Sequence, residues 1–477
     1  MACPSGTAPL SLRPIAAALA ASLTLAPLEA LATQTVSNCN DSGGGSLRAA
    51  LGAAADGELI DATGLVCGTI SLSTGVLIVA NDAQKIDGPG ADKLTIDAAG
   101  NTDGGPVFFH NGSKTLEIDH VTVSHGHKYN NDNAHNVGGG CISSQGNVTL
   151  TQTVVSDCTM TAGANTHAKG GAIFALGDVT LTESRVTGNS THGASPFGYE
   201  MHTYGGGIFS NGTITLDHST VSGNHAYIGG GIYSDFATSV DSSTISENTA
   251  DQGGAIDCRC ALQISYSTIS NNHARTAGAI ELQQSNTAAA SPMFIRNSTI
   301  SGNTISGGIF SPGVDSGVPI TISNSTIAFN VAGAGNAEGA LYSYAATLTL
   351  QSTIVSDNYP FDVDVQGGTT AISGAKNLVP NPSPAAVAAL PFGTQNACPL
   401  LQPLAWNGGP TQTLALRSSS PAIGAGNNLI PLFFDQRGSG FPRVHGINPD
   451  VGAFEWQGNL VDDSIFRGTF EPGLCHL

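Results

Sequence analysis

The sequence predicts an all-β chain that folds as a parallel β-helix, a solenoid of stacked coils. One sequence pattern returns from about residue 138 to residue 358, and its shortest spacing, 24 residues, recurs. The chain contains 61 Gly in 477 residues, and charged residues make up only 11%. Ser, Thr and Asn supply most of the remaining polarity, a composition typical of strands and tight turns rather than helices.

Each copy of the repeat has three parts. It begins with small residues and an apolar residue, as in Gly170-Gly171-Ala172-Ile173, and continues with an alternating strand such as Val179-Thr180-Leu181. It ends with Ser-Thr-Val/Ile and, three residues on, an amide or an acid. The positions assigned to this last residue are Asp157, Asn189, Asn224, Asn248, Asn272, Asn303, Asn330 and Asp357. A propeller blade would need about 40 residues, and a β-sandwich does not explain why identical residues recur at equivalent places.

Stacked coils place equivalent side chains above one another, at the roughly 4.8 Å spacing of strands. We therefore expect an interior column of branched aliphatic residues: Val186, Val221, Ile245, Ile269, Ile300, Ile327 and Ile354. The Asn residues at the turns are expected to form an amide ladder, because each can bond its own backbone and the Asn of the next coil.

The two ends of the chain differ from the repeats. Residues 1–32 contain Arg13, an apolar run and the small residues Ala30-Leu31-Ala32, which is the pattern of a secretory signal peptide. Residues 33–68 are predicted to form an N-terminal cap with a short helix between about residues 46 and 55. We assign residues 69–375 to the β-helix, 376–457 to a C-terminal capping region and 458–477 to a tail.

The nine cysteines fit an exported protein, because cleavage after residue 32 would remove Cys3 and leave eight. Cys39 and Cys67 flank the N-terminal unit and are the first disulfide that we predict. Cys141 and Cys158 are the second pair. Cys258-Arg259-Cys260 is too tight for an easy bridge, and a metal site there lacks a matching Cys/His pair.

The charge balance limits the partners. With 35 acidic and 16 basic residues the net charge is −19, so nucleic acid and acidic membrane surfaces would be repelled. No segment after the signal peptide reaches the roughly 18 apolar residues of a membrane helix. We therefore expect no transmembrane span in the mature chain. The signal-peptide pattern predicts an extracellular or cell-envelope location. The partner that we expect is carbohydrate or a cell-surface protein.

The repeats resemble those of right-handed parallel β-helix proteins and of polymorphic outer membrane proteins. The segment from Cys39 to Arg48 is similar to the first segment of many such exported proteins. Four motifs in the C-terminal region resemble the choice-of-anchor Q domain: Asn407-Gly408-Gly409-Pro410-Thr411, Ser420-Pro421-Ala422-Ile423, Asp435-Gln436-Arg437-Gly438 and Asp450-Val451-Gly452-Ala453-Phe454-Glu455. Trp406 and Gly424 stand where acidic residues are common in that domain. The resemblance implies a right-handed coil, export and surface association, and no particular reaction.

We therefore predict an adhesive, binding or structural surface protein without catalysis. The alternative is a polysaccharide lyase or glycoside hydrolase of the pectin-lyase-like fold. A lyase must neutralise a uronic carboxylate and abstract a proton, yet basic residues are scattered through the repeats. Asn101-Thr102-Asp103 and the segment from Ser124 to His127 are faintly similar to pectinase motifs, but the adjacent Asp pair is missing. We assign no catalytic residue.

Several His, Tyr and Arg residues lie between a coil-ending turn and the next Gly pair, so they are expected to line one side of the solenoid. We predict that this ridge contacts a ligand; alternatively, these side chains simply tolerate exposed loops. The candidate residues are His127, His135, His202, Tyr204, His225, Tyr227, His273 and Arg275.

Two acidic groups remain. Asp357, Asp362 and Asp364 could bind Ca²⁺, but such acids usually just solvate a loop, so we predict no cofactor and no metal site. In the C-terminal region we expect ion pairs that hold the fold together, among Asp435, Arg437, Asp450 and Glu455.

Overall fold

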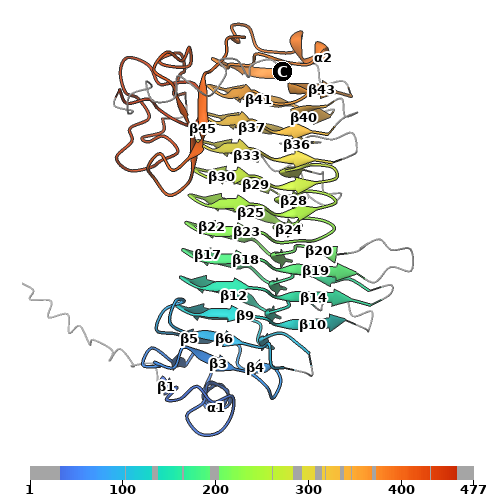
Figure 1. Cartoon of the computed structure of the whole chain (residues 1–477), viewed down its shortest axis with the longest axis vertical. Coiled ribbons are helices and arrows are strands. Elements are labelled where there is room, and N and C mark those ends of the chain that lie inside the picture. The colour runs from blue at the N-terminus through green and yellow to red at the C-terminus, as the bar shows by residue number, and fades with distance from the viewer. Residues whose placement is uncertain are drawn as a thin grey trace, which may run out of the picture.

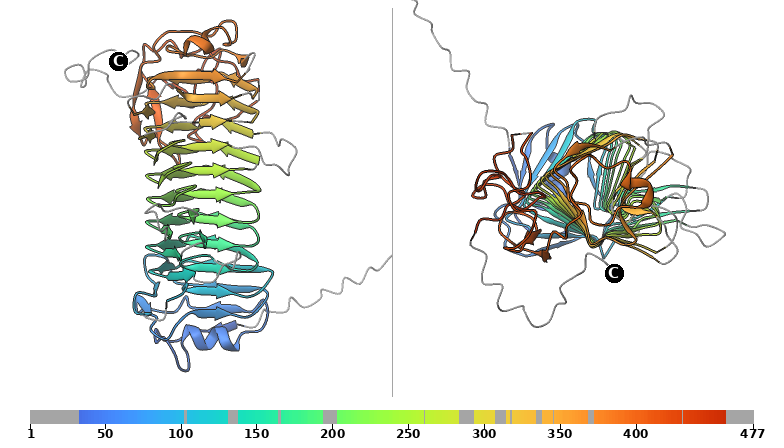
Figure 2. Two further views of the ribbon diagram at one scale, coloured as in Figure 1. Left: turned by 90° about the vertical axis from the view of Figure 1, so that its right-hand side faces the viewer. Right: turned by 90° about the horizontal axis from the view of Figure 1, so that it is seen from above.

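The computed structural model describes residues 33–458, apart from residues 102–103, 131–137, 164–165, 194–202, 260, 283–292, 307–313, 317, 334–337, 345, 368–371 and 430. Over these residues the chain is a right-handed parallel β-helix, as predicted (Figure 1). Three long parallel sheets, which we call A, B and C, surround one apolar core, and the coils are seen end-on in Figure 2. No helix in this part of the chain is both long and apolar enough to cross a membrane.

Sheet A contains the strands β1 (Thr33–Thr35), β2 (Leu59–Asp61), β5 (Gln84–Asp87), β8 (Thr115–Asp119), β12 (Asn147–Thr151), β17 (Val179–Thr182), β22 (Ile214–Asp217), β25 (Ala237–Asp241), β29 (Ala261–Ser265), β33 (Met293–Arg296), β37 (Ile320–Ser323), β41 (Leu348–Gln351) and β44 (Ile372–Ala375). Sheet B contains β3 (Thr69–Ser71), β6 (Thr95–Asp97), β9 (Thr122–Ser124), β13 (Val154–Ser156), β18 (Arg185–Thr187), β23 (Thr220–Ser222), β26 (Thr244–Ser246), β30 (Thr268–Ser270), β34 (Thr299–Ser301), β38 (Thr326–Ala328) and β42 (Ile354–Ser356).

Sheet C contains β4 (Leu77–Val79), β7 (Phe108–His110), β11 (Ile142–Ser144), β16 (Ile173–Ala175), β21 (Ile208–Ser210), β24 (Ile232–Ser234), β28 (Ile256–Cys258), β32 (Ile280–Leu282), β36 (Val314–Ser316), β40 (Gly339–Tyr344) and β43 (Phe361–Gln366). Short strands between sheets B and C form two groups that we call sheet D: β10 (His127–Asn130), β14 (Thr159–Ala162) and β19 (Ser190–Gly193), then β27 (Thr249–Ala250), β31 (His273–Ala274), β35 (Thr304–Ile305) and β39 (Val331–Ala332). The pair β15 (Ala168–Lys169) and β20 (Thr203–Tyr204) forms a strip of its own.

The middle residue of each strand in sheet B points into the core. Ile245, Ile269 and Ile300 are register partners on consecutive strands, and all three side chains are fully buried. This confirms that equivalent side chains stack along a single axis. One residue of the predicted column is wrong, because Ile327 pairs with Val355 rather than with Ile354. Side chains alternate between the two faces of a strand, so Ile354 points outward from this sheet.

The predicted amide ladder is present, shifted by one residue at both of its ends. The backbone N–H and the side-chain amide of Asn224 both donate to Oδ1 of Asn248, at 3.0 and 2.9 Å, and the pattern repeats from Asn189 to Asn358. Cys158, whose N–H donates to Asn189, takes the place that we assigned to Asp157, and Asn358 takes that of Asp357. Both aspartates instead occupy the left-handed turn position before the ladder, with φ of 57° and 58°.

A second ladder joins the coils between sheets A and B. The N–H of Ser219 donates to the hydroxyl of Ser243 at 2.9 Å, and the N–H of Ser243 donates to the hydroxyl of Ser267 at 3.1 Å. The two ladders satisfy buried backbone N–H groups at both ends of the strands of sheet B, where an unpaired group would be costly.

The N-terminal end is closed as predicted. Helix α1 (Leu47–Ala53) begins after Ser46, whose hydroxyl accepts from the N–H of Ala49, and it buries Leu47, Ala50 and Leu51. Arg48 pairs with Asp41 at 2.6 Å and donates to the carbonyl groups of Gly75 and Val76. Disulfides join Cys39 to Cys67 and Cys141 to Cys158, which confirms both predicted pairs.

The C-terminal region does more than cap the solenoid. Helix α2 (Pro384–Val387) packs on β43 at the C-terminal end of the coils. Residues 398–457, which we call the C-terminal arm, then lie along the flank, beginning with the antiparallel pair β45 (Leu401–Ala405) and β46 (Thr413–Leu416) (Figure 1). Arm residues such as Val451 and Phe454 pack in a cluster with the outward-facing Ile354.

Candidate functional site

The outward face of sheet C carries a column of side chains that changes character along the solenoid. Register pairs place Phe174, Phe209, Tyr233, Asp257 and Glu281 at equivalent positions on five consecutive strands, β16 to β32. The Phe209 ring stacks on its neighbours, with centroid distances of 5.6 Å to Phe174 and 5.4 Å to Tyr233. The column is therefore aromatic on β16, β21 and β24 and acidic on β28 and β32.

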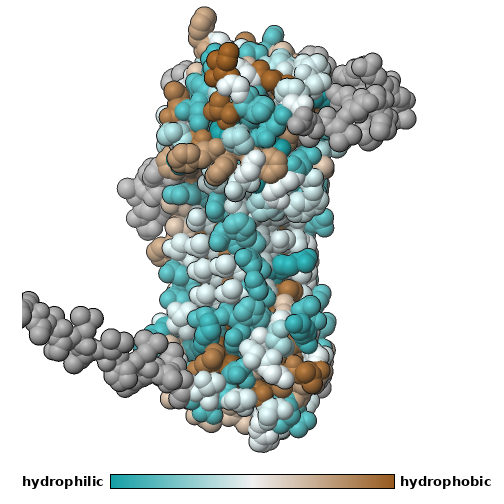
Figure 3. Space-filling view, turned by 90° about the vertical axis from the view of Figure 1, so that its left-hand side faces the viewer, coloured by the Kyte–Doolittle hydropathy of each residue, from teal (hydrophilic) through white to brown (hydrophobic). Residues whose placement is uncertain are grey.

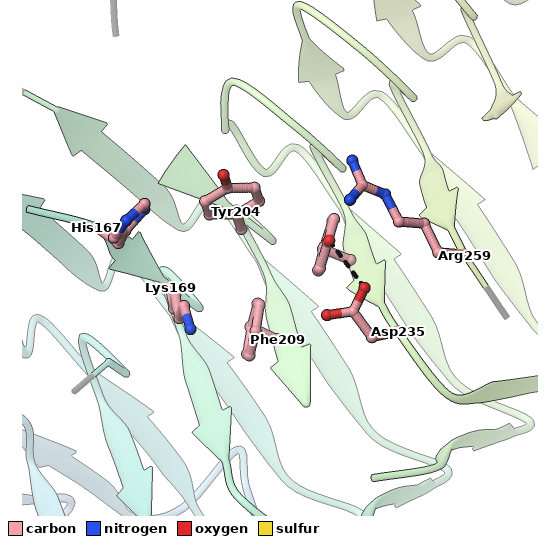
Figure 4. Close-up of a pocket in the computed structure, with 7 residues that line it drawn as sticks. His167, Lys169, Tyr204, Phe209, Asp235 and Arg259 are labelled. Atoms are coloured by element: carbon pink, nitrogen blue, oxygen red, sulfur yellow. Dashed lines mark hydrogen bonds between the residues drawn. The ribbon is translucent and has the colours of Figure 1, made fainter. Parts of the chain in front are cut away.

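A cavity of about 220 Å³ opens beside this change (Figure 4). Two of its residues come from the β15–β20 strip, in which Lys169 and Tyr204 are register partners. Five more complete the lining, which consists of His167, Lys169, Tyr204, Phe209, Tyr233, Asp235 and Arg259. We call this cavity the aromatic–cation pocket. It is smaller than the roughly 300–1,000 Å³ of pockets for drug-sized ligands, so it suits one ring-sized unit of a larger ligand.

Aromatic rings define the walls of the pocket. The Nζ atom of Lys169 lies 4.8 Å from the centre of the Phe209 ring, a cation–π distance. The Tyr204 ring meets the Tyr233 ring edge to face at 5.0 Å. The His167 ring lies 5.9 Å from that of Tyr204. Flat apolar faces beside polar ring edges are the surfaces on which sugar rings stack.

Burial shifts the protonation equilibria in and below the pocket. It lowers the pKa of the Lys169 amine, although Asp235 opposes the shift. It raises the pKa of the Tyr233 phenol, whose hydroxyl donates to Asp235 at 2.9 Å. The fully buried Asp257 carboxyl makes no hydrogen bond within the described residues, and burial together with the neighbouring Glu281 raises its pKa well above the usual value.

Among the described residues that line the pocket, two are basic, Lys169 and Arg259, and one is acidic, Asp235. The pocket is therefore locally positive although the whole chain carries a net charge of −19.

The residues that we predicted to form one ridge lie in different parts of the structure. His225 is in register with Thr249, and Thr249 with His273, so both histidines belong to one column of sheet D. Each hydrogen-bonds through Nδ1 to the hydroxyl of the next coil: His225 to Thr249 at 2.9 Å, and His273 to Thr304 at 2.8 Å.

The other predicted ridge residues lie in three different places. His127 begins β10, at the first end of sheet D. Arg275 forms two 2.8 Å bonds with the carboxylate of Asp251, next to Tyr227. Of the eight candidate residues, Tyr204 lines the pocket; His167 and Lys169, which also lie between a coil-ending turn and the next Gly pair, line it too. His135 and His202 lie outside the described residues.

Sequence reasoning missed Phe209, Tyr233, Asp235 and Arg259. A signal for the first two was present, because each is the middle residue of a strand that follows a run of glycines, the position that must point outward from sheet C. Arg259 carried no comparable signal. Arg259 reaches the pocket because β28, which ends one residue before Arg259, pairs in register with β24, which ends one residue before Asp235.

The described residues contain no group of three His, Cys, Asp or Glu arranged to hold a metal ion. Asp362 accepts from the Asn358 and Asn381 N–H groups, and Asp364 accepts from the Ser383 hydroxyl. Asp362 and Asp364 therefore join the last coil to the segment that follows it through hydrogen bonds. Cys258 and Cys398 are also disulfide-bonded, so neither offers a free thiolate as a metal ligand.

Comparisons with known proteins show no family for this chain. No family model matches the chain, and no curated protein matches it. A solved structure that does match is that of the PL6 family alginate lyase AlyGC, with 11% sequence identity and a TM-score of 0.36. The match covers 81% of this chain and 56% of the lyase chain, so this chain spans little more than half of that protein.

Proposed function

We propose that this protein is an exported β-helix protein, secreted or held at the cell envelope, that binds an acidic polysaccharide through the aromatic–cation pocket. The observation that carries the proposal is the convergence of Lys169 and Arg259 on a pocket walled by Tyr204, Phe209 and Tyr233. The cations would hold a sugar carboxylate, while the ring faces would pack against the sugar. Asp235 and His167 would bind hydroxyl groups.

Export and envelope attachment are part of the same proposal. They are supported by the signal-peptide pattern of residues 1–32, by the disulfides and by the resemblance of the C-terminal motifs to the choice-of-anchor Q domain. Expression of the full chain, followed by cell fractionation and N-terminal sequencing, tests this part. A mature chain that begins at Thr33 outside the cytoplasm is the expected result, and an uncleaved cytoplasmic chain would overturn it.

Binding is tested by calorimetry with polyuronates and with neutral glycans of similar length. Lys169→Met keeps the methylene groups over Phe209 and removes the charge, so the affinity for polyuronate should fall about tenfold or more. Lys114→Met is the matched control, because it removes one positive charge at an exposed site beside Asp56. Equal losses in both variants would show a general charge effect and would contradict a pocket-specific role for Lys169.

Cleavage of the bound polymer by β-elimination is a second candidate function. The observation that favours it is that Lys169, whose pKa burial lowers, shares the pocket with Arg259. A lyase needs a base and, beside it, a cation for the uronate carboxylate. Hydrolysis is less well supported, since it needs two carboxyl groups and Asp235 supplies the one carboxyl among the described residues that line the pocket. The ultraviolet absorbance of an unsaturated product would show cleavage, and its loss in Lys169→Met would place that reaction in the pocket.

A further inference from the structure

A row of threonine hydroxyls runs along the outside of sheet B. Thr220, Thr244, Thr268, Thr299 and Thr326 are successive register partners, each at the first position of its strand. Parallel strands are about 4.8 Å apart, so the row offers one hydroxyl per coil at a constant interval. We call it the hydroxyl row.

The C-terminal arm covers one end of this row. Thr268 donates to the carbonyl of Gln412, and its hydroxyl accepts from the Gln436 side chain at 2.9 Å. Thr299 donates to the Gln436 amide oxygen, and the Thr326 hydroxyl accepts from the N–H of Ala453 at 3.0 Å. Every covered hydroxyl thus bonds an uncharged polar group of the C-terminal arm.

The other end of the row is open. Thr220 and Thr244 are half-buried, and within the described part of the chain their hydroxyls make no hydrogen bond. Ser222 and Ser246 form a second hydroxyl row two residues further along the same strands. Figure 3 faces the side that carries the arm, and the surface between the arm and the N-terminal cap is mostly pale to hydrophilic there. Thr220 and Thr244 therefore continue the surface on which the C-terminal arm packs, beyond the last threonine that the arm covers.

We propose that the open hydroxyl row, centred on Thr220 and Thr244, binds a neutral linear polysaccharide whose chain runs along the solenoid axis. Such a polymer presents hydroxyl groups at a regular interval, which a periodic row can match coil after coil. Hydroxyls both donate and accept, and the threonine methyl groups can contact the C–H faces of sugar rings.

Charge favours a neutral polymer over an anionic one on this face. The four residues Thr220, Ser222, Thr244 and Ser246 carry no charge, and the next strand contributes one cation, Arg185. A polyanion would meet a chain of net charge −19 without the two cations that the aromatic–cation pocket provides. The site stands independently of the proposed function, because it lies on a different sheet.

Co-sedimentation of the full chain with insoluble cellulose and chitin tests the proposal. Thr220→Val with Thr244→Val removes two hydroxyls at nearly constant shape, and binding should weaken roughly tenfold. Thr220→Ser with Thr244→Ser keeps the hydroxyls and should retain binding. Thr180→Val with Thr215→Val is the matched control on the outward face of sheet A, where those two residues are also register partners, and it should bind like the unsubstituted chain.

Three results would overturn the proposal. The unsubstituted chain could fail to bind either polysaccharide, or the valine pair on sheet B could bind as well as the control pair. A dimer in light scattering that the sheet B valine pair abolishes would instead assign the row to a second copy of this chain. Lys169→Met should leave co-sedimentation unchanged, so failure of the pocket proposal can be told apart from failure of this one.

Discussion

Asn358 donates both its backbone N–H, at 3.2 Å, and its side-chain amide, at 3.1 Å, to the same carboxylate oxygen of Asp362. Asp362 has no amide to pass on, so it ends the ladder of asparagines that begins at Asn189. Burial raises the pKa of Asp362 to about 7, and in its ionised form this carboxylate can only accept hydrogen bonds. Asp362 can therefore end the ladder, because each asparagine in it donates its N–H groups to the next residue of the ladder.

The interior of that ladder should be costly to interrupt. Asn248 accepts from the N–H and side-chain amide of Asn224 and donates to the carbonyl of Val221. Asn248→Ala would leave these buried groups unpaired, at about 1–3 kcal/mol for each group. We expect the urea midpoint to fall clearly, whereas Gln263→Ala, which removes an exposed amide from sheet A, should leave it within error. Similar midpoints would show that water replaces the ladder bonds.

The turn before the ladder should be improved by glycine at one position. Glu247 has φ of 58°, while the equivalent residues of the two preceding coils are Gly223 and Gly188, with φ of 64° and 68°. A side chain in this left-handed region costs about 1–2 kcal/mol. Glu247→Gly should therefore raise the melting temperature, and Glu247→Ala, which keeps a Cβ atom, should not. A gain in the alanine variant would attribute the effect to the lost charge instead.

Acidification should stabilise the last coils through Glu338. This residue is only 5% exposed, and burial together with the charge of Asp364 raises its pKa to about 7. The unfolded chain releases the proton near its ordinary pKa, so the contribution of this group to stability is fully present below about pH 4.5 and is lost as the pH rises through 7. The loss is on the order of 3 kcal/mol at most.

Thermal melts from pH 4 to pH 8 test this prediction. Glu338→Gln keeps the shape of the side chain and cannot ionise, so its melting temperature should exceed that of the unsubstituted chain at pH 8 and approach it at pH 4. Exposed Glu247 supplies the control, because Glu247→Gln should follow the unsubstituted chain over the whole range. Parallel curves for the chain and Glu338→Gln would mean that the Glu338 carboxyl stays ionised in the folded state.

The repeats could be predicted from sequence because each coil of a solenoid packs only on its neighbours. A local pattern then determines both the interior column and the ladder. The errors arose where that pattern is ambiguous. Asp357 stands next to Asn358, and both can serve a turn, so spacing alone does not say which one joins the ladder. The assignment of Ile354 to the interior column failed for the same reason, because a shift of one residue reverses the face of a strand.

The pocket could not be predicted in the same way. Lys169 and Tyr204 reach it from the β15–β20 strip, in coils of unequal length, and sequence does not show which sheet face such a strip will cover. The pKa of Asp257 depends on burial beneath that face, which has no local sequence signal. Tyr204 was predicted as a ligand residue for its exposure on a ridge, whereas its ring contacts Tyr233 in the pocket wall.

The arm should depend on one buried ion pair. Arg443 and Glu455 are fully buried and 2.9 Å apart, and Arg443 also donates to the carbonyl groups of Asp450 and Gly452. Sequence reasoning placed Glu455 in an ion pair but did not name this partner. It also expected Arg437 to pair within the region, and the Arg437–Asp435 pair at 2.6 Å bears this out.

Loss of Arg443 should loosen the arm and leave the coils intact. Arg443→Met leaves the Glu455 carboxyl, whose pKa burial already raises to about 7, without its partner, at a cost of about 3–5 kcal/mol. Limited proteolysis with mass spectrometry should then find cuts within residues 398–457, while the far-ultraviolet circular dichroism of the solenoid stays unchanged. Arg417→Met, in the same arm and half-buried, should stay resistant. Adding Glu455→Met to Arg443→Met should restore much of the resistance to proteolysis, because it removes the unpaired carboxyl. If resistance does not recover, the lost hydrogen bonds from Arg443 to Asp450 and Gly452 matter more than the ion pair.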